Sequence, residues 1–193
     1  RLKSDAVLDG TLRPTYAQLE NERRGTMRVL VSAASKHGAT KEIGEYLGDT
    51  LRSRGLDVSV VEPDEAKPDA GYHAVVFGSG VYAGRWLKDA KSLAERISAT
   101  KPRPHVWLFS SGPLGDPPKP DEEPGDVADI AELVSPIEHR IFAGKIDKSD
   151  LGFGERAIMA AVRAPEGDFR DWDEIAAWAN GIADVLETVP GTT

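Results

Sequence analysis

A short segment rich in hydroxyl groups, Ser35-Lys36-His37-Gly38-Ala39-Thr40, joins an apolar run to a stretch with helical periodicity. Such a segment suits a phosphate monoester, because the first turn of a helix offers free N–H groups and the positive end of its dipole. Ser35 and Thr40 can add O–H donors, and Gly38 lets the backbone approach a ligand closely. The sequence therefore predicts a phosphate-binding loop over 35–40, with a plain polar turn as the alternative.

Other common chemistries lack their residues. The P-loop pattern G-x-x-x-x-G-K-[ST] and the three-glycine dinucleotide fingerprint are both missing after the first apolar run. No histidine stands in an H-E-x-x-H arrangement, and the chain has no cysteine, so thiol nucleophiles, Cys-ligated zinc and iron–sulfur clusters are excluded. Electrons, if the protein moves them, would need a bound organic cofactor or a His/carboxylate metal site.

The segments that must position the loop alternate between strand and helix patterns. Short apolar runs predict strands at 29–31, 58–61, 74–77, 106–109 and 140–143. Apolar residues three or four apart predict helices over 39–54, 86–99 and 126–134, and a last helix that begins near Asp171 with Glu174 in capping-box spacing.

This alternation predicts an α/β fold, a doubly wound five-stranded parallel sheet with helices on both faces. Ligands of such sheets bind outside the C-terminal ends of the strands. Three loops leave those ends, at 32–40, 78–86 and 110–117. We therefore expect the functional residues to lie in these loops.

Composition sets the broad class. The chain has 193 residues, of which 40% are hydrophobic and 29% charged, with a net charge of −8, as in a soluble globular domain. No apolar run approaches the roughly 18–20 residues of a membrane span, so we expect a cytoplasmic protein with at most a peripheral membrane contact. No long Lys/Arg cluster suggests nucleic acid. The patterning predicts an N-terminal extension over 1–26, a compact domain over 27–189 and a tail over 190–193.

The segment Ser35–Thr40 resembles the phosphate-binding loop of flavodoxins, whose pattern is [T/S]-x-x-G-x-T. The resemblance implies a flavodoxin-like sheet with strand order 2-1-3-4-5 and one FMN at the C-terminal ends of the strands. A deazaflavin in place of FMN stays open. In this loop the resemblance assigns phosphate contacts to Ser35, Gly38, Ala39 and Thr40, and backbone N–H groups to Lys36 and His37.

The loops after the third and fourth strands would hold the flavin ring. An isoalloxazine ring needs a flat apolar face and main-chain groups at its polar edge. Tyr82 or Trp86 would give the face; the alternative for Trp86 is a core residue that begins helix 86–99. A plain turn is the alternative for 110–117. The expected ring contacts are Val81, Tyr82, Ala83, Gly84, Trp86, Ser110, Ser111, Gly112, Pro113, Leu114 and Gly115.

Two C-terminal runs resemble the flavodoxin-domain branch that includes menaquinone-dependent protoporphyrinogen oxidase. They are Phe142-Ala143-Gly144-Lys145 and Gly167-Asp168-Phe169-Arg170-Asp171-Trp172. That branch carries extra sequence before the last helix, as this chain does at 145–170. Within it, 151–162 predicts a short amphipathic helix that suits a hydrophobic substrate or a membrane surface, or else covers the sheet edge. The insert lacks a strongly basic stretch for an anionic membrane.

Three functions are compatible with these features. The first is an FMN-dependent oxidoreductase resembling protoporphyrinogen oxidase, which would pass electrons from a hydrophobic small molecule to a quinone or other redox partner. The second is a flavodoxin-type electron carrier, which predicts an acidic rim where this chain has Lys36, His37, Arg85 and Lys88. The third is a flavin-free interaction domain, against which the hydroxyl-rich loop argues. No spacing singles out a catalytic acid or base among Tyr82, His37 and Arg85, and no metal site is expected.

Overall fold

The computed structural model describes residues 26–112, 125–147, 149, 152 and 166–189. Its centre is a parallel sheet in the order β2-β1-β3-β5-β6. Its strands are β1 (Arg28–Ala34), β2 (Asp57–Val60), β3 (Ala74–Tyr82), β5 (His105–Ser111) and β6 (Glu138–Phe142). Because β4 is only a short hairpin strand beside β3, the main strands follow the expected 2-1-3-4-5 order, and the flavodoxin-like fold class is confirmed.

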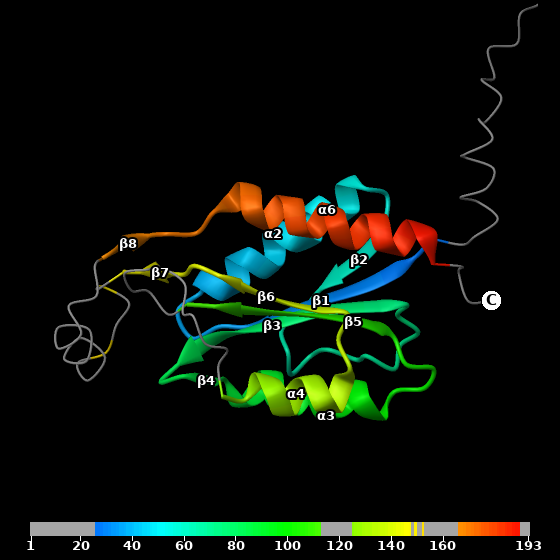
Figure 1. Ribbon diagram of the computed structural model, residues 1–193, viewed down its shortest axis with the longest axis horizontal. Coiled ribbons are helices and arrows are strands. Elements are labelled where there is room, and N and C mark those ends of the chain that lie inside the picture. The colour runs from blue at the N-terminus through cyan, green and yellow to red at the C-terminus, as the bar shows by residue number, and fades with distance from the viewer. Residues whose placement is uncertain (1–25, 113–124, 148, 150–151, 153–165, 190–193) are drawn as a thin grey trace, which may run out of the picture.

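Two pairs of helices cover the two faces of this sheet (Figure 1). The helices α2 (Ala39–Ser53) and α6 (Trp172–Thr188) lie on one face, and α3 (Lys88–Ala99) and α4 (Val127–Val134) lie on the other. Side chains of β1 alternate between two cores, so that Val29 and Val31 pack under α2 and α6 while Leu30 packs under α3 and α4. A strand buried on both faces reads as a continuous apolar run, which is why the sequence located it.

The strands extend beyond their apolar runs, so the predicted loops are shorter than expected. The region 78–86 was expected to be a loop, but β3 continues to Tyr82 and pairs with β4 (Arg85–Trp86) in a hairpin. Only Ala83 and Gly84 form the turn, with φ angles of 50° and 73°. Positive φ at both central residues matches the twist of a hairpin. Helix α3 consequently begins at Lys88, after the hairpin, rather than at residue 86.

The connection between β6 and α6 contains a second small sheet. There β7 (Lys145–Ile146) pairs antiparallel with β8 (Gly167–Asp168), which leads into α6. The predicted cap of α6 is present, because the Asp171 carboxylate accepts a hydrogen bond from Glu174 N at 3.0 Å. The helix expected at 151–162, the segment 1–25 and the tail lie outside the described residues. Within the described ranges no helix has the length and apolar character to cross a membrane.

Candidate functional site

The C-terminal ends of β1, β3, β5 and β6 lie at one edge of the sheet, on the left in Figure 1. The loop after β1, the β3–β4 hairpin, the end of β5 and the β7–β8 pair all lie at this edge. The described residues of the three predicted loops are therefore brought together, as expected for parallel strands.

The 35–38 turn leads directly into α2. Gly38 is the N-cap residue, with a φ of 85°, and its backbone oxygen accepts a hydrogen bond from Glu42 N. A Cβ on Gly38 would meet nothing within 4 Å, so the backbone there is open to a ligand. Thr40 is 3% exposed and lies in the first turn of α2. The turn thus combines a helix N-terminus, an accessible backbone and a hydroxyl held in place.

Ser35 supplies the second hydroxyl. Its Oγ is buried and has no hydrogen-bond partner in the part of the chain that the structure describes. A buried hydroxyl left in this state costs about 1–3 kcal/mol, so the position favours a ligand that brings an acceptor oxygen. A phosphate group meets this requirement, and the residues present fit one.

Tyr82 links the hairpin to this turn. A Cβ on Gly80 would lie 2.9 Å from Tyr82 Cε2 and 3.0 Å from Thr40 Oγ1, so the ring and the hydroxyl share the space above Gly80. The Tyr82 ring centroid is 6.0 Å from that of His37 and 5.8 Å from Lys36 Nζ. An aromatic face at the end of β3 therefore lies beside the phosphate-binding candidates from β1 and α2.

Trp86 occupies a different environment. It is 3% exposed, packs edge-on against Phe77 at 5.8 Å, and donates from Nε1 to Ser110 Oγ at 2.8 Å. The same Ser110 oxygen lies 2.9 Å from His139 Nε2. Trp86 is thus a core residue, as the alternative interpretation held, although it lies in β4 and does not begin the helix. A ring enclosed in this way offers no open face. Tyr82 is the aromatic residue that the structure brings to the edge.

Asp126 holds the hairpin from the other side, a role that the sequence did not reveal. Its Oδ2 accepts hydrogen bonds from Trp86 N at 3.1 Å and from Lys91 Nζ at 2.7 Å, and its Oδ1 lies 3.6 Å from Arg85 Nη1. The hydrogen bond from Lys91 is the largest cause that holds the pKa of Asp126 below its ordinary value of 3.8. The carboxylate is therefore charged at neutral pH and ties α3 and α4 to the hairpin.

The end of β5 approaches the end of β6 very closely. Ser110 and Ser111, expected in a loop, lie within β5, in register with β3 and β6. Gly112 follows with a φ of 86° and donates from its N–H to Phe142 O at 3.1 Å. A Cβ on Gly144 would lie 3.2 Å from Gly112 N, so glycine permits this contact. Pro113, Leu114 and Gly115 lie outside the described residues.

The flavodoxin-domain family matches residues 30–173, most of the chain. The chain belongs to this family. The cofactor that membership of the flavodoxin-domain family implies is FMN. No curated protein matches the chain.

Solved flavodoxin structures share the fold of this flavodoxin domain. An archaeal flavodoxin is 19% identical with a TM-score of 0.56, covering 83% of this chain and 99% of its own. Streptococcus pneumonia TIGR4 flavodoxin is 16% identical with a TM-score of 0.57, and the match covers 82% of this chain and 99% of the flavodoxin. Rubredoxin oxygen:oxidoreductase from the anaerobe Desulfovibrio gigas is 14% identical with a TM-score of 0.59, covering 86% of this chain. This chain covers only 37% of the rubredoxin oxygen:oxidoreductase chain. Sequence identities of 14%, 16% and 19% show the fold alone.

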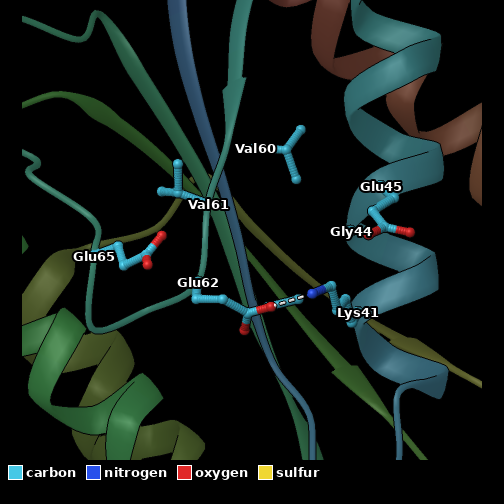
Figure 2. A pocket seen from close by; sticks show the side chains of 8 residues that line it. Lys41, Gly44, Glu45, Val60, Val61, Glu62 and Glu65 are labelled. Carbon is cyan, nitrogen blue, oxygen red and sulfur yellow. Dashed lines mark ion pairs between the residues drawn. The ribbon is translucent and has the colours of Figure 1, made fainter.

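A cavity of about 220 Å³ lies beside α2, between that helix and the chain after β2 (Figure 2). Three carboxylates line it against one ammonium group, and Lys41 is already paired with Glu62, as the dashed line shows. The hydrogen bond to Glu62 is also the main cause that raises the pKa of Lys41. An acidic cavity repels a phosphate, so it is not the phosphate site of this flavodoxin domain. Its lining residues are Ala33, Lys41, Gly44, Glu45, Val60, Val61, Glu62 and Glu65.

Proposed function

We propose that this flavodoxin domain holds the FMN phosphate on the 35–40 loop and the flavin ring against the β3–β4 hairpin, and passes electrons to a redox partner. The observation that carries the proposal is the buried Ser35 Oγ, which has no hydrogen-bond partner among the described residues and precedes the open N-terminus of α2. FMN, when bound, supplies the one- or two-electron chemistry. The protein supplies position and electrostatics.

At the phosphate end, the chain's own groups would act as donors. Ser35 and Thr40 donate O–H groups, while Lys36, His37, Gly38 and Ala39 present backbone N–H groups near the positive end of α2. Uncharged donors and a helix dipole stabilise an anion without an arginine in contact with it.

At the ring end, Tyr82 offers the flat face, and backbone groups of Val81, Ala83 and Gly84 reach the polar edge of the flavin. Gly112 approaches from the β5 side. Pro113, Leu114 and Gly115, which the sequence adds to the expected ring contacts, lie outside the described residues. Ser110 and Trp86 support this end through their hydrogen bond inside the core, and Ser111 through the β5 ladder.

The proposal is tested by the colour and the FMN affinity of the protein. Purified protein is expected to be yellow or to take up added FMN, and Ser35→Ala with Thr40→Val is expected to weaken FMN binding by roughly 1–3 kcal/mol, as lost hydrogen bonds to a charged group do. Isothermal titration measures the dissociation constant. The matched control is Ser98→Ala with Thr188→Val, whose hydroxyls bond helix carbonyls at exposed sites. A purified protein that does not bind added FMN would refute the proposal.

A second candidate is the oxidation of a hydrophobic substrate with a quinone acceptor, as in protoporphyrinogen oxidase. What favours it is the long β6–α6 connection, whose β7–β8 pair lies at the same sheet edge, and the basic residues Lys36, Arg85 and Lys88 where a carrier would have an acidic rim. The FMN-loaded protein is mixed with protoporphyrinogen and a menaquinone analogue. Turnover supports the oxidase; no turnover, with rapid electron exchange with a ferredoxin reductase, supports the carrier.

A further inference from the structure

Arg170, in the turn between β8 and α6, is enclosed although it is charged. Its side chain is 3% exposed. Its Nε donates to Asp168 Oδ1 at 2.8 Å and its Nη2 to Asp168 Oδ2 at 2.6 Å, a bidentate pair. Its Cζ also lies 4.5 Å from the centroid of the Trp172 ring. These contacts fix the guanidinium group in one orientation.

The remaining nitrogen of Arg170 reaches across to the first turn of α2. Nη1 donates to Glu42 Oε2 at 2.7 Å and to Ala39 O at 3.1 Å. Ala39 belongs to the 35–40 loop, and Glu42 lies in the first turn of α2. A residue of the β6–α6 connection is thereby bonded to the loop proposed to hold the phosphate.

The negative charge of Glu42 matters for phosphate binding. A carboxylate in the first turn of a helix lies close to where a phosphate binds at that helix N-terminus, and two like charges there repel. The Arg170 side chain is 3% exposed and that of Glu42 is 49% exposed, so solvent screens this pair in part. The guanidinium group thus offsets a negative charge that would oppose phosphate binding.

We propose that Arg170 is a positioning residue that makes the 35–40 loop selective for the phosphorylated flavin, FMN, over riboflavin. It does so by holding the Ala39 carbonyl and by pairing with the Glu42 carboxylate through Nη1, while Nε and Nη2 pair with Asp168. This inference rests on the proposed FMN function. Arg170 acts through α2, and its effect is confined to the phosphate end of the ligand.

The test compares the dissociation constants of FMN and riboflavin, measured by quenching of flavin fluorescence. Arg170→Met is expected to weaken FMN binding roughly tenfold, the scale of one partly buried charge interaction, and riboflavin binding less than about twofold. Adding Glu42→Gln is expected to recover part of the FMN affinity, because the carboxylate in the first turn of α2 is then gone while that of Asp168 stays without its partner. Arg54→Met is the matched control, since Arg54 also ties α2 to a C-terminal element, through Asp184 and Glu187.

The outcomes separate this inference from the function on which it rests. A wild-type protein that binds no FMN overturns the proposed function. If the wild type binds FMN but Arg170→Met weakens both flavins equally, or neither, the positioning role is overturned. Glu42→Gln in the wild-type background tests the same idea when Arg170→Met does not fold. It should leave FMN affinity within about twofold, because the Glu42 carboxylate is already paired with Arg170, and a large gain would contradict the proposal.

Discussion

The two ends of the candidate flavin site are built differently. The phosphate end is a local structure, in which six consecutive residues, Ser35–Thr40, form a turn and the first residues of α2. The ring end is assembled from distant parts of the chain. Tyr82 closes β3, Gly112 follows β5, and Asp126 comes from the start of α4. A local motif can be recognised in a sequence, whereas an assembled surface depends on the tertiary structure.

This difference predicts which substitutions act on the phosphate end and which act on the ring end. Changes in the 35–40 loop are expected to act on phosphate recognition alone, and thus on FMN but not on riboflavin. Changes in the hairpin are expected to act on both ligands, because both carry the same ring. The ratio of the two affinities therefore reports which end has been disturbed.

The largest expected effect comes from Gly78→Ala, which should disturb the phosphate end and the ring end together. A Cβ at Gly78 would lie 2.3 Å from Phe109 O and 2.5 Å from Phe109 Cγ. Backbone and ring atoms of a neighbouring buried strand cannot move aside cheaply, so β3 and β5 must separate. The loss of unfolding free energy is expected to be about 3 kcal/mol, measured by urea denaturation.

The control for this prediction is Gly181→Ala in α6. A Cβ there would meet nothing within 4 Å, and alanine favours the helix, so the variant should be more stable by about 0.5–1 kcal/mol. Because β3 carries Gly80 and Tyr82 next to Thr40, Gly78→Ala should also weaken both flavins together. A Gly78→Ala protein as stable as the control would show that the sheet absorbs the methyl group.

The sequence predicted the elements whose side chains are periodic and missed those that depend on distant contacts. Strands such as 29–31 were located because burial on both faces demands apolar residues. The hairpin was missed because Ala83 takes a positive φ that alanine rarely adopts, so the usual Asn-Gly signal of such a turn is absent. The bond from Arg170 to Glu42 joins residues 128 positions apart, and no local pattern encodes it.

Within the predicted site, the same division applies to the aromatic residues. Tyr82 and Trp86 are equally plausible as ring partners in a sequence, because both flank the same glycine, Gly84. Only the tertiary structure shows that the Trp86 indole is bonded to Ser110 inside the core. Burial depends on α4 and β5, which the local sequence does not describe.

An intermediate effect is expected from Tyr82→Leu, which tests whether Tyr82 belongs to the ring end of the site. Loss of the ring removes the flat face of the candidate site, and the affinities for FMN and riboflavin should fall together by about 1 kcal/mol, the scale of an aromatic contact. Fluorescence titration with both ligands gives the two constants. Tyr72→Leu is the control, because Tyr72 also has a cation over its ring, Arg28 at 4.9 Å, but precedes β3. A fall for FMN alone would assign Tyr82 to the phosphate end instead.

The smallest effect concerns the charge that supports the ring end. Because the pKa of Asp126 is held below 3.8, chiefly by the hydrogen bond from Lys91, the unfolded chain binds protons at this group more readily than the folded chain. Its stabilisation is therefore complete above the unfolded value and is lost as the pH falls through the lower, folded value. Asp126→Asn should cost about 0.5–1 kcal/mol at neutral pH and flatten the loss of stability below about pH 4.

Urea denaturation across the acid range measures both quantities for Asp126→Asn. The control is Asp129→Asn, which removes the same charge from an exposed position of α4. Since Asp126 accepts from Trp86 N, its replacement should loosen the hairpin and weaken FMN and riboflavin alike by a small factor. A change confined to FMN would mean that the hairpin acts on the phosphate end, through the space above Gly80 that Tyr82 and Thr40 both line, and that the two ends form one coupled site.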